Sequence, residues 1–138
     1  MPKALDADVR RLIDAPNFAA FTTLMPDGAP KVEPVWVARE GDYVLVATDS
    51  RGVKGKNVEN DKRVALSVSD FANPYEQALI RGRVIEIVAI GMSLLFEQGI
   101  VIAITHDELA GGNLALLDSI AQRIDDVIDL VHRADGWR

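Results

Sequence analysis

The chain has 138 residues, 49% of them apolar, and a formal net charge of -6 at pH 7. This length and composition predict one domain, residues 1–138, with an ordinary hydrophobic core. The absence of cysteine excludes disulfides, thiolate metal sites and thiol nucleophiles, and it suits a protein of the reducing cytoplasm. The negative charge argues against non-specific nucleic-acid binding, which depends on a basic surface.

The sequence predicts neither a targeting segment nor a membrane partner. The N-terminal stretch MPKALDADVRRL lacks the apolar run of a secretory signal. The longest apolar window, residues 88–104, contains Glu97, Gln98 and two glycines, and it is shorter than the roughly 18 to 20 residues of a spanning helix. We therefore expect a cytoplasmic protein in which this window belongs to the core.

Residues 6–15, DADVRRLIDA, predict a short helix that ends before the following proline. Asp6 or Asp8 can cap its first turn. Its apolar residues fall on one face at helical spacing, and they are Val9, Leu12 and Ile13.

Three strands are expected next. Residues 18–25, FAAFTTLM, are rich in aromatic and β-branched residues, and PDGAP at residues 26–30 has the composition of a turn. Residues 31–39, KVEPVWVAR, alternate as a strand does, but Pro34 removes one ladder donor, so this strand should be an edge or should bulge there. Residues 43–49, YVLVATD, predict the third strand.

Two further strand-like runs come after a basic segment. They are VALSVSD at residues 64–70 and ALIRGRVIEIV at residues 78–88, joined by a loop at residues 71–77. Five strands with one helical crossover predict a small antiparallel β-barrel. The last third of the chain is ambiguous, because VIDLVHR at residues 127–133 fits either a helix or a closing sixth strand.

The basic segment Gly52–Arg63, GVKGKNVENDKR, concentrates cations in an acidic chain. Its first part predicts a helix, and a helix N-terminus beside Lys54 and Lys56 is an anion site. Thr48 and Ser50, at the end of the preceding strand, have hydroxyls that can donate to the same oxygens. The spacing is not that of a Walker loop. The segment therefore indicates either a phosphate cradle or a solvated, charged connecting helix.

Three stretches follow one another in a specific order: FAAFTTLMPDGAPKVEPVWV, GDYVLVATDSRGVKGKNVENDKRVALSV and NPYEQALIRGRVIEI. They contain a DG-x-P turn, a P-x-W strand, a lysine and asparagine segment before RVALSV, and an NPY run that leads to RGRV. This ordered set, from residue 12 to residue 87, resembles the pyridoxamine 5'-phosphate oxidase-like split β-barrel superfamily. It is most similar to the branch that binds the deazaflavin coenzyme F420.

The resemblance implies a mainly β fold with flanking helices, a six-stranded antiparallel split β-barrel that forms a homodimer. It also implies a flat flavin-like cofactor in a cleft between the two subunits. The residues implied to hold the cofactor phosphate are Thr48, Ser50, Lys54, Lys56 and Asn57. Those implied to border its ring are Pro34, Val35 and Trp36, with Tyr75 approaching from the other subunit.

The activity implied is that of an F420-dependent reductase, which transfers hydride from the reduced deazaflavin to an electron-poor conjugated small molecule. An FMN-binding oxidoreductase of the same fold is an alternative, because a phosphate cradle does not distinguish the two cofactors. A non-catalytic flavin or deazaflavin carrier and a plain structural dimer are further alternatives. The sequence contains no acid–base constellation and no metal-ligand spacing, so we assign neither a catalytic residue nor a metal.

Two strand residues fall outside this assignment. Arg81 and Arg83 lie on one face of the strand predicted at residues 78–88, and we interpret them as pairing with Glu86 or with a partner chain. Gln77 and Leu79 stand where related sequences often have tyrosine and glutamate, so the wall of the implied cleft differs here.

Overall fold

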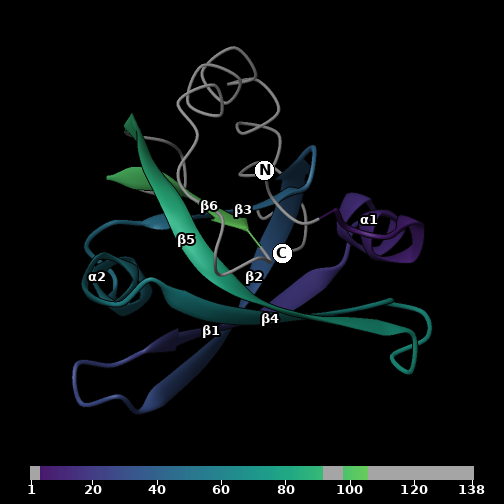
Figure 1. The fold of residues 1–138 in the computed structure, drawn as a ribbon, viewed down its shortest axis with the longest axis horizontal. Coiled ribbons are helices and arrows are strands. Elements are labelled where there is room, and N and C mark those ends of the chain that lie inside the picture. Colours follow the sequence, from purple (N-terminus) through teal and green to yellow (C-terminus); the bar gives the residue numbers. More distant parts are fainter. Residues whose placement is uncertain (1–3, 92–97, 106–138) are drawn as a thin grey trace.

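The computed structural model describes residues 4–91 and 98–105. Within these ranges six strands close one antiparallel barrel in the order β1-β2-β3-β6-β5-β4 (Figure 1). The predicted six-stranded, mainly β fold is therefore confirmed. The strands are β1 Phe18–Leu24, β2 Pro30–Glu40, β3 Tyr43–Asp49, β4 Arg63–Ser69, β5 Gln77–Gly91 and β6 Gly99–Thr105.

Two long strands, β2 and β5, allow the sheet to turn its corners. β2 pairs with β1 through residues 30–36 and with β3 through residues 37–40. β5 likewise pairs with β4 through its first half and with β6 through its second half. Within the described part of the chain, Pro34 has a ladder neighbour on one side only, which is Ala20. The edge position that its missing N–H requires is thus confirmed.

The turns between the first three strands have the conformations that their sequences predict. Gly28, in the turn between β1 and β2, has φ +87°, and Gly41, between β2 and β3, has φ +59°. Side chains rarely adopt such angles, so glycine is needed at both positions. In the first turn Asp27 accepts from the N–H of Ala29 at 2.9 Å, which is the local bond expected of an aspartate in a turn.

The strand that closes the barrel is β6, between β3 and β5. Sequence patterns alone do not assign it, and the alternative at residues 127–133 lies outside the described residues. Every residue of β6 is buried, so its apolar run lacks the alternation by which a half-exposed strand is recognised. Ile102 packs in the barrel core, whereas Val101 and Ala103 pack in a second apolar cluster on the outer side.

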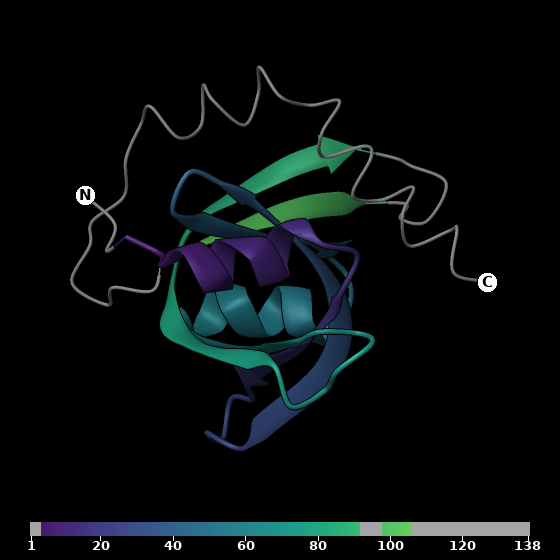
Figure 2. The same ribbon diagram turned by 90° about the vertical axis from the view of Figure 1, so that its right-hand side faces the viewer.

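The two helices lie at opposite ends of the barrel (Figure 1), and the strands curve around both of them (Figure 2). α1, Ala7–Asp14, precedes β1, and α2, Val53–Asn60, connects β3 to β4. The helix predicted at residues 6–15 begins and ends within one residue of α1, and the helix predicted in the first part of the basic segment is α2. Of the helices that the structure describes, neither has the length and hydropathy to cross a membrane.

The cap and the apolar face predicted for α1 are confirmed. Asp6 is the N-cap, and its carboxylate accepts from the N–H of Val9 at 2.9 Å. Leu12 and Ile13 are buried in the barrel core, and Val9 packs against it. α1 therefore closes one end of the barrel with its apolar face.

Replacing Val101 with threonine tests whether the outer side of β6 is shielded from water. The two side chains have nearly the same shape, but threonine would bury a hydroxyl at a position that is 0% exposed. We expect the free energy of unfolding, measured with urea, to fall by about 1–3 kcal/mol. Val32→Thr, at a position 61% exposed, is the matched control. Val32→Thr should change the free energy of unfolding by less than about 0.5 kcal/mol. Equal losses in the two variants would contradict the burial of Val101.

Candidate functional site

The start of α2 carries positive charge. Gly52 is the N-cap, and it has no side chain that accepts from the first N–H groups. The first turn contains no acidic residue, so the positive end of the helix dipole is not neutralised from within the helix. Lys54 is half-buried and Lys56 is exposed. This combination favours an anion at the N-terminus of α2.

α2 packs very closely against the end of β3. A Cβ added at Gly55 would lie 2.8 Å from the backbone oxygen of Asp49 and 2.9 Å from that of Ser50. The turn between β3 and α2 is ordered by Asp49, whose carboxylate accepts from the side chain of Arg51 at 3.2 Å and from its N–H at 2.8 Å. These bonds, the side-chain ones first, lower the pKa of Asp49 to about 2. A charged Asp49 therefore holds the turn at neutral pH.

Asn57 attaches the other side of α2 to β1. Its amide nitrogen donates to Thr23 Oγ1 at 3.0 Å and to Met25 Sδ at 3.3 Å, and the residue is only 3% exposed. This amide nitrogen points into the protein rather than toward a ligand on the surface. Its position favours a role in holding α2 in place. Asn57 would then support the predicted phosphate cradle indirectly, by positioning the helix.

Lys54 connects α2 to β2. Its ammonium lies 2.8 Å from Glu33 Oε2, and Lys31 Nζ lies 2.9 Å from the other oxygen of the same carboxylate. The hydrogen bonds from Lys54 and then Lys31 lower the pKa of Glu33. The three charges leave one net positive charge beside Pro34, the residue that follows Glu33 in β2. The predicted phosphate residues and the predicted ring-binding strand thus meet at this ion pair.

A shallow pocket of about 350 Å³ opens beside this cluster, on the outer face of β1, β2 and β4. Its wall is largely apolar, and two serine hydroxyls of β4 add polar groups. The residues that line it are Phe18, Ala19, Ala20, Val32, Glu33, Pro34, Ser67 and Ser69. A mostly apolar cleft with a few polar groups at its rim is the usual form of a small-molecule site.

The three predicted ring-contacting residues of β2 have different surroundings. Pro34 is exposed and lines the pocket. Val35 is buried in the barrel core. Trp36 is 8% exposed and stacks on Phe18, with ring centroids 4.2 Å apart. Pro34 therefore reaches the pocket directly, while Trp36 supports the Phe18 side of it.

Thr48 and Ser50 differ in accessibility. Thr48 is 3% exposed within the ladder between β3 and β6. Ser50 is half-buried beside α2, and its hydroxyl donates to Gln98 Oε1 at 3.3 Å. Of these two predicted phosphate donors, Ser50 is the one that a ligand at the start of α2 could reach without displacing buried atoms.

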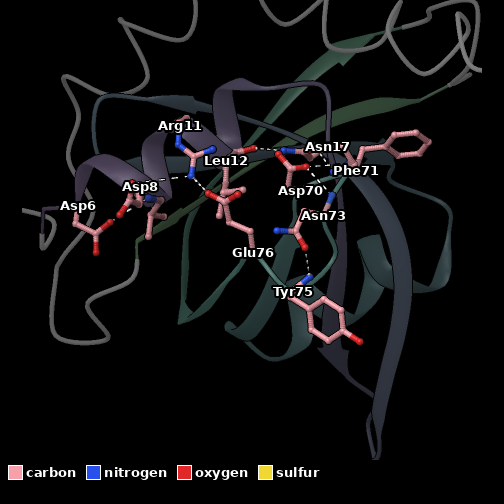
Figure 3. Close-up of polar contacts among 12 residues, drawn as sticks. Asp6, Asp8, Arg11, Leu12, Asn17, Asp70, Phe71, Asn73, Tyr75 and Glu76 are labelled. Carbon is pink, nitrogen blue, oxygen red and sulfur yellow. Dashed lines mark hydrogen bonds and ion pairs between the residues drawn. The ribbon is translucent and has the colours of Figure 1, made fainter.

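The loop between β4 and β5, residues 70–76, is ordered by its own side chains (Figure 3). Asp70 accepts from the N–H groups of Ala72 and Asn73, both at 2.9 Å. Asn73 in turn accepts from the N–H of Tyr75 at 3.3 Å. Aspartate and asparagine side chains often shape turns in this way.

The same loop is attached to α1 (Figure 3). Asn17, which is 3% exposed, donates to the backbone oxygen of Leu12 and accepts from the N–H of Phe71, each at 2.9 Å. Arg11 forms an ion pair with Glu76 at the end of the loop. The loop is therefore held at both of its ends.

This ordered loop presents two aromatic side chains to solvent. Tyr75 is 94% exposed and Phe71 is 67% exposed. Figure 3 shows the Tyr75 ring pointing away from α1, and the pocket of the same chain is lined by other residues. The structure thus joins Lys54 to Glu33, the residue before Pro34, but leaves Tyr75 outside the pocket of its own chain.

Four residues at the pocket are absent from the sequence-based set. They are Phe18, Glu33, Ser67 and Ser69. A signal existed for Glu33, because a carboxylate within an apolar strand and next to a proline is unusual. The serines alternate with buried residues of β4, and that pattern also fits any half-exposed strand, so it does not indicate a site.

Comparison with known proteins agrees with this fold. The family model for pyridoxamine 5'-phosphate oxidase matches residues 5–90. An F420 reductase structure superposes with a TM-score of 0.62 at 24% identity, covering 70% of this chain and 90% of that one. A putative pyridoxamine 5'-phosphate oxidase from Lactobacillus delbrueckii gives 0.61 at 17% identity, covering 76% and 95%. General stress protein 26 of Bacillus anthracis gives 0.58 at 15% identity, covering 71% and 85%. None of the curated proteins matches the chain.

The closed six-stranded antiparallel barrel with two helices is consistent with the class of split-barrel proteins related to pyridoxamine 5'-phosphate oxidase. Within that class, the chain belongs to the pyridoxamine 5'-phosphate oxidase family, whose model matches well over half of it. At these identities the solved structures establish the shared fold.

Replacing Gly55 with alanine tests the close approach of α2 to β3. Alanine is the better helix former by about 1 kcal/mol, so a spacious site would be stabilised by the change. Because the new Cβ would meet two backbone oxygens, we instead expect a loss of about 1–3 kcal/mol in the free energy of unfolding. At Gly52 the nearest atom to an added Cβ is 3.4 Å away, so Gly52→Ala is the control. It should cost about 1 kcal/mol at most, the usual cost of alanine at an N-cap.

Proposed function

We propose that the protein is a homodimeric reductase that uses F420 as its hydride donor. The observation that carries this proposal is the ion pair between Lys54 and Glu33. It joins a helix start suited to phosphate to the strand whose Pro34 lines an apolar pocket. A cofactor with a flat ring and a phosphate-bearing side chain requires both features within reach of each other.

The residues have distinct roles in this proposal. The N-terminus of α2, Lys54, Lys56 and Ser50 bind the phosphate, and Asn57 keeps α2 in position. Pro34 borders the ring, and Trp36 supports that side of the pocket through Phe18. Lys54 exchanges part of its interaction with Glu33 for the phosphate, and Lys31 keeps the Glu33 carboxylate paired.

When bound, the reduced deazaflavin supplies a hydride to an electron-poor conjugated double bond, and a proton completes the reduction. The chain itself contributes binding, orientation and exclusion of water. The titratable residue among those that line the pocket is Glu33, and its carboxylate is already paired with two lysines. We therefore assign it no acid–base role.

FMN is the second candidate cofactor, because its phosphate would suit the same cradle. The likeness of the ordered motifs to the deazaflavin branch favours F420, and so does the superposition on a protein described as an F420 reductase. A non-catalytic carrier of either cofactor would use the same binding residues, and it differs from the reductase only by lacking turnover.

The second subunit is proposed on the exposure of the loop at residues 70–76. Two aromatic side chains on an ordered loop expose apolar area that association would remove from water. In the proposed dimer Tyr75 of each chain approaches the ring site of its partner. This accounts for a tyrosine that is ordered locally but does not line the pocket of its own chain.

Removing the two lysines tests the phosphate cradle. We expect Lys54→Ala/Lys56→Ala to weaken F420 binding by at least about tenfold, since hydrogen bonds to charged groups contribute about 1.5–3 kcal/mol each. The measurement is a fluorescence-quenching titration with F420 and, separately, with FMN. Lys62→Ala is the control, because its ammonium bonds to Val58 O at the opposite end of α2. Unchanged affinity in the double variant would exclude the cradle.

Removing the exposed ring of Tyr75 tests the dimer. We expect the wild-type chain to sediment as a dimer and Tyr75→Ala to raise the dissociation constant of that dimer about tenfold or more, because an aromatic ring at an interface is a frequent hot spot. Its secondary structure should not change, since the ring is 94% exposed. Arg39→Gln, on the α1 side of β2, is the control. A monomeric wild-type chain at micromolar concentration would contradict the proposal.

A further inference from the structure

Three arginines converge on the outer face of β4 and β5. Arg63 of β4 and Arg83 of β5 are direct cross-strand partners, and Arg81 lies two residues from Arg83 on the same face, opposite Ala65. All three arginines are exposed. Like charges placed directly opposite each other destabilise a sheet. The pairing of Arg63 with Arg83 therefore lowers the stability of the sheet when no anion is bound.

The described acidic residues offset only part of this charge. Arg63 forms two hydrogen bonds with Asp61, at 3.1 and 2.8 Å. Arg63, through its hydrogen bonds, and then Arg83, through its charge, lower the pKa of Asp61. Among residues 4–91 and 98–105, neither Arg81 nor Arg83 forms an ion pair, so the pairing with Glu86 is not formed, and the alternative pairing with a partner chain stays a prediction. Two guanidinium groups are thus held side by side in a chain of net charge -6.

A pocket of about 190 Å³ lies at Arg63 and Arg81, and Arg83 adjoins it as the cross-strand partner of Arg63. Its wall has an apolar part and a polar part, the latter made by two arginines and a threonine hydroxyl. The lining residues are Thr22, Leu24, Arg63, Val64, Ala65 and Arg81. An apolar floor with guanidinium groups at the rim fits a small organic anion, since arginine matches the planar geometry of carboxylate and phosphate.

This pocket adjoins the one beside Pro34. Ala20 of β1 lines the first pocket and Thr22 lines the second, and the two residues are neighbours on one face of the strand, about 7 Å apart. Ser67 and Ala65 of β4 repeat this relation on the neighbouring strand. One ligand, or two ligands in contact, can therefore occupy both pockets.

We propose that the pocket at Arg81, Arg83 and Arg63 binds a carboxylate or phosphate group. Building on the proposed reductase function, the group belongs to the hydride acceptor, which is then an anionic conjugated compound. The acceptor lies with its conjugated part toward Pro34 and its anionic group toward the arginines. The guanidinium groups select against neutral acceptors, because they form charge-assisted hydrogen bonds only with the anionic group.

The first test needs no cofactor. Benzoate is titrated into the ¹⁵N-labelled wild-type protein at about 0.15 M salt, which screens long-range attraction, with benzamide as the neutral isostere. We expect saturable shifts of the amide signals of Leu24, Ala65 and Arg81 with benzoate and much weaker ones with benzamide. Absence of saturable benzoate shifts, or equal shifts with both compounds, would overturn the site.

Variants then identify the groups responsible. Arg81→Gln/Arg83→Gln should weaken benzoate binding by about tenfold or more, whereas Lys54→Ala/Lys56→Ala should leave it unchanged. Arg83→Lys keeps the charge, and it should retain part of the affinity. The amide spectrum reports in the same experiment whether each variant is folded. Unchanged benzoate affinity in the folded arginine variant would overturn the assignment.

A last comparison distinguishes the origin of the anionic group. If the group is on the acceptor, Arg81→Gln/Arg83→Gln should retain the wild-type affinity for F420 and raise KM for anionic acceptors far more than for neutral ones. Loss of F420 affinity in this variant would instead assign the site to the cofactor and overturn the acceptor assignment. If the wild-type chain binds benzoate but not F420, the reductase proposal fails while the anion site stands.

Discussion

The close packing of α2 against the end of β3 is the constraint on which the candidate site depends. Gly55 permits the backbone contact, and Asn57 anchors the opposite side of the same helix to Thr23. With α2 fixed on both sides, the side chain of Lys54 reaches across to Glu33. A helix displaced outward by the width of one methyl group would separate the cationic helix start from the pocket-bearing strand.

The charges of the molecule are distributed unevenly over the barrel. The chain is acidic, yet cations gather at two places, which are the Lys31, Lys54 and Lys56 group and the arginines of β4 and β5. Each group contains a carboxylate, Glu33 or Asp61, that neutralises it only in part. Partial neutralisation limits repulsion in the empty protein while leaving net positive charge for a ligand.

Local signals in the sequence predict much of this fold. The cap at Asp6, the glycine turn at Gly28 and the edge position of Pro34 each depend on residues close in the chain, and all are confirmed. β6 could not be assigned in this way, because a strand buried on both faces has no alternation. The six-strand count came from family resemblance, and the identity of the sixth strand came from the structure.

The candidate site was predictable only in outline for a related reason. Lys54 and Pro34 each belong to a motif, but the hydrogen bond from Lys54 to Glu33 joins residues 21 positions apart in the chain, and only the fold brings them together. Asn57 belongs to the same motif as the lysines, yet its amide is buried against β1, and no pattern in the sequence distinguishes a ligand-binding asparagine from an anchoring one. For Arg81 and Arg83 the sequence indicates only a structural role, because their surroundings depend on which strands lie beside them.

The two sides of the barrel surface have different compositions, and this difference accounts for the position of both pockets. On the outer side of β3, β6 and β5, large side chains such as Leu45 and Val101 pack into a closed apolar cluster. On the outer side of β1 and β4 the central residues are small, namely Ala20, Thr22, Ala65 and Ser67. These small side chains leave the two pockets on this part of the surface, and larger groups line them at the margin, Pro34 in one and Arg81 in the other. Exposure of such a surface is unfavourable where its methyl groups and Cα–H groups face water. Binding of a planar molecule or of a second chain removes that cost, so the same composition favours both the ligand and the dimer.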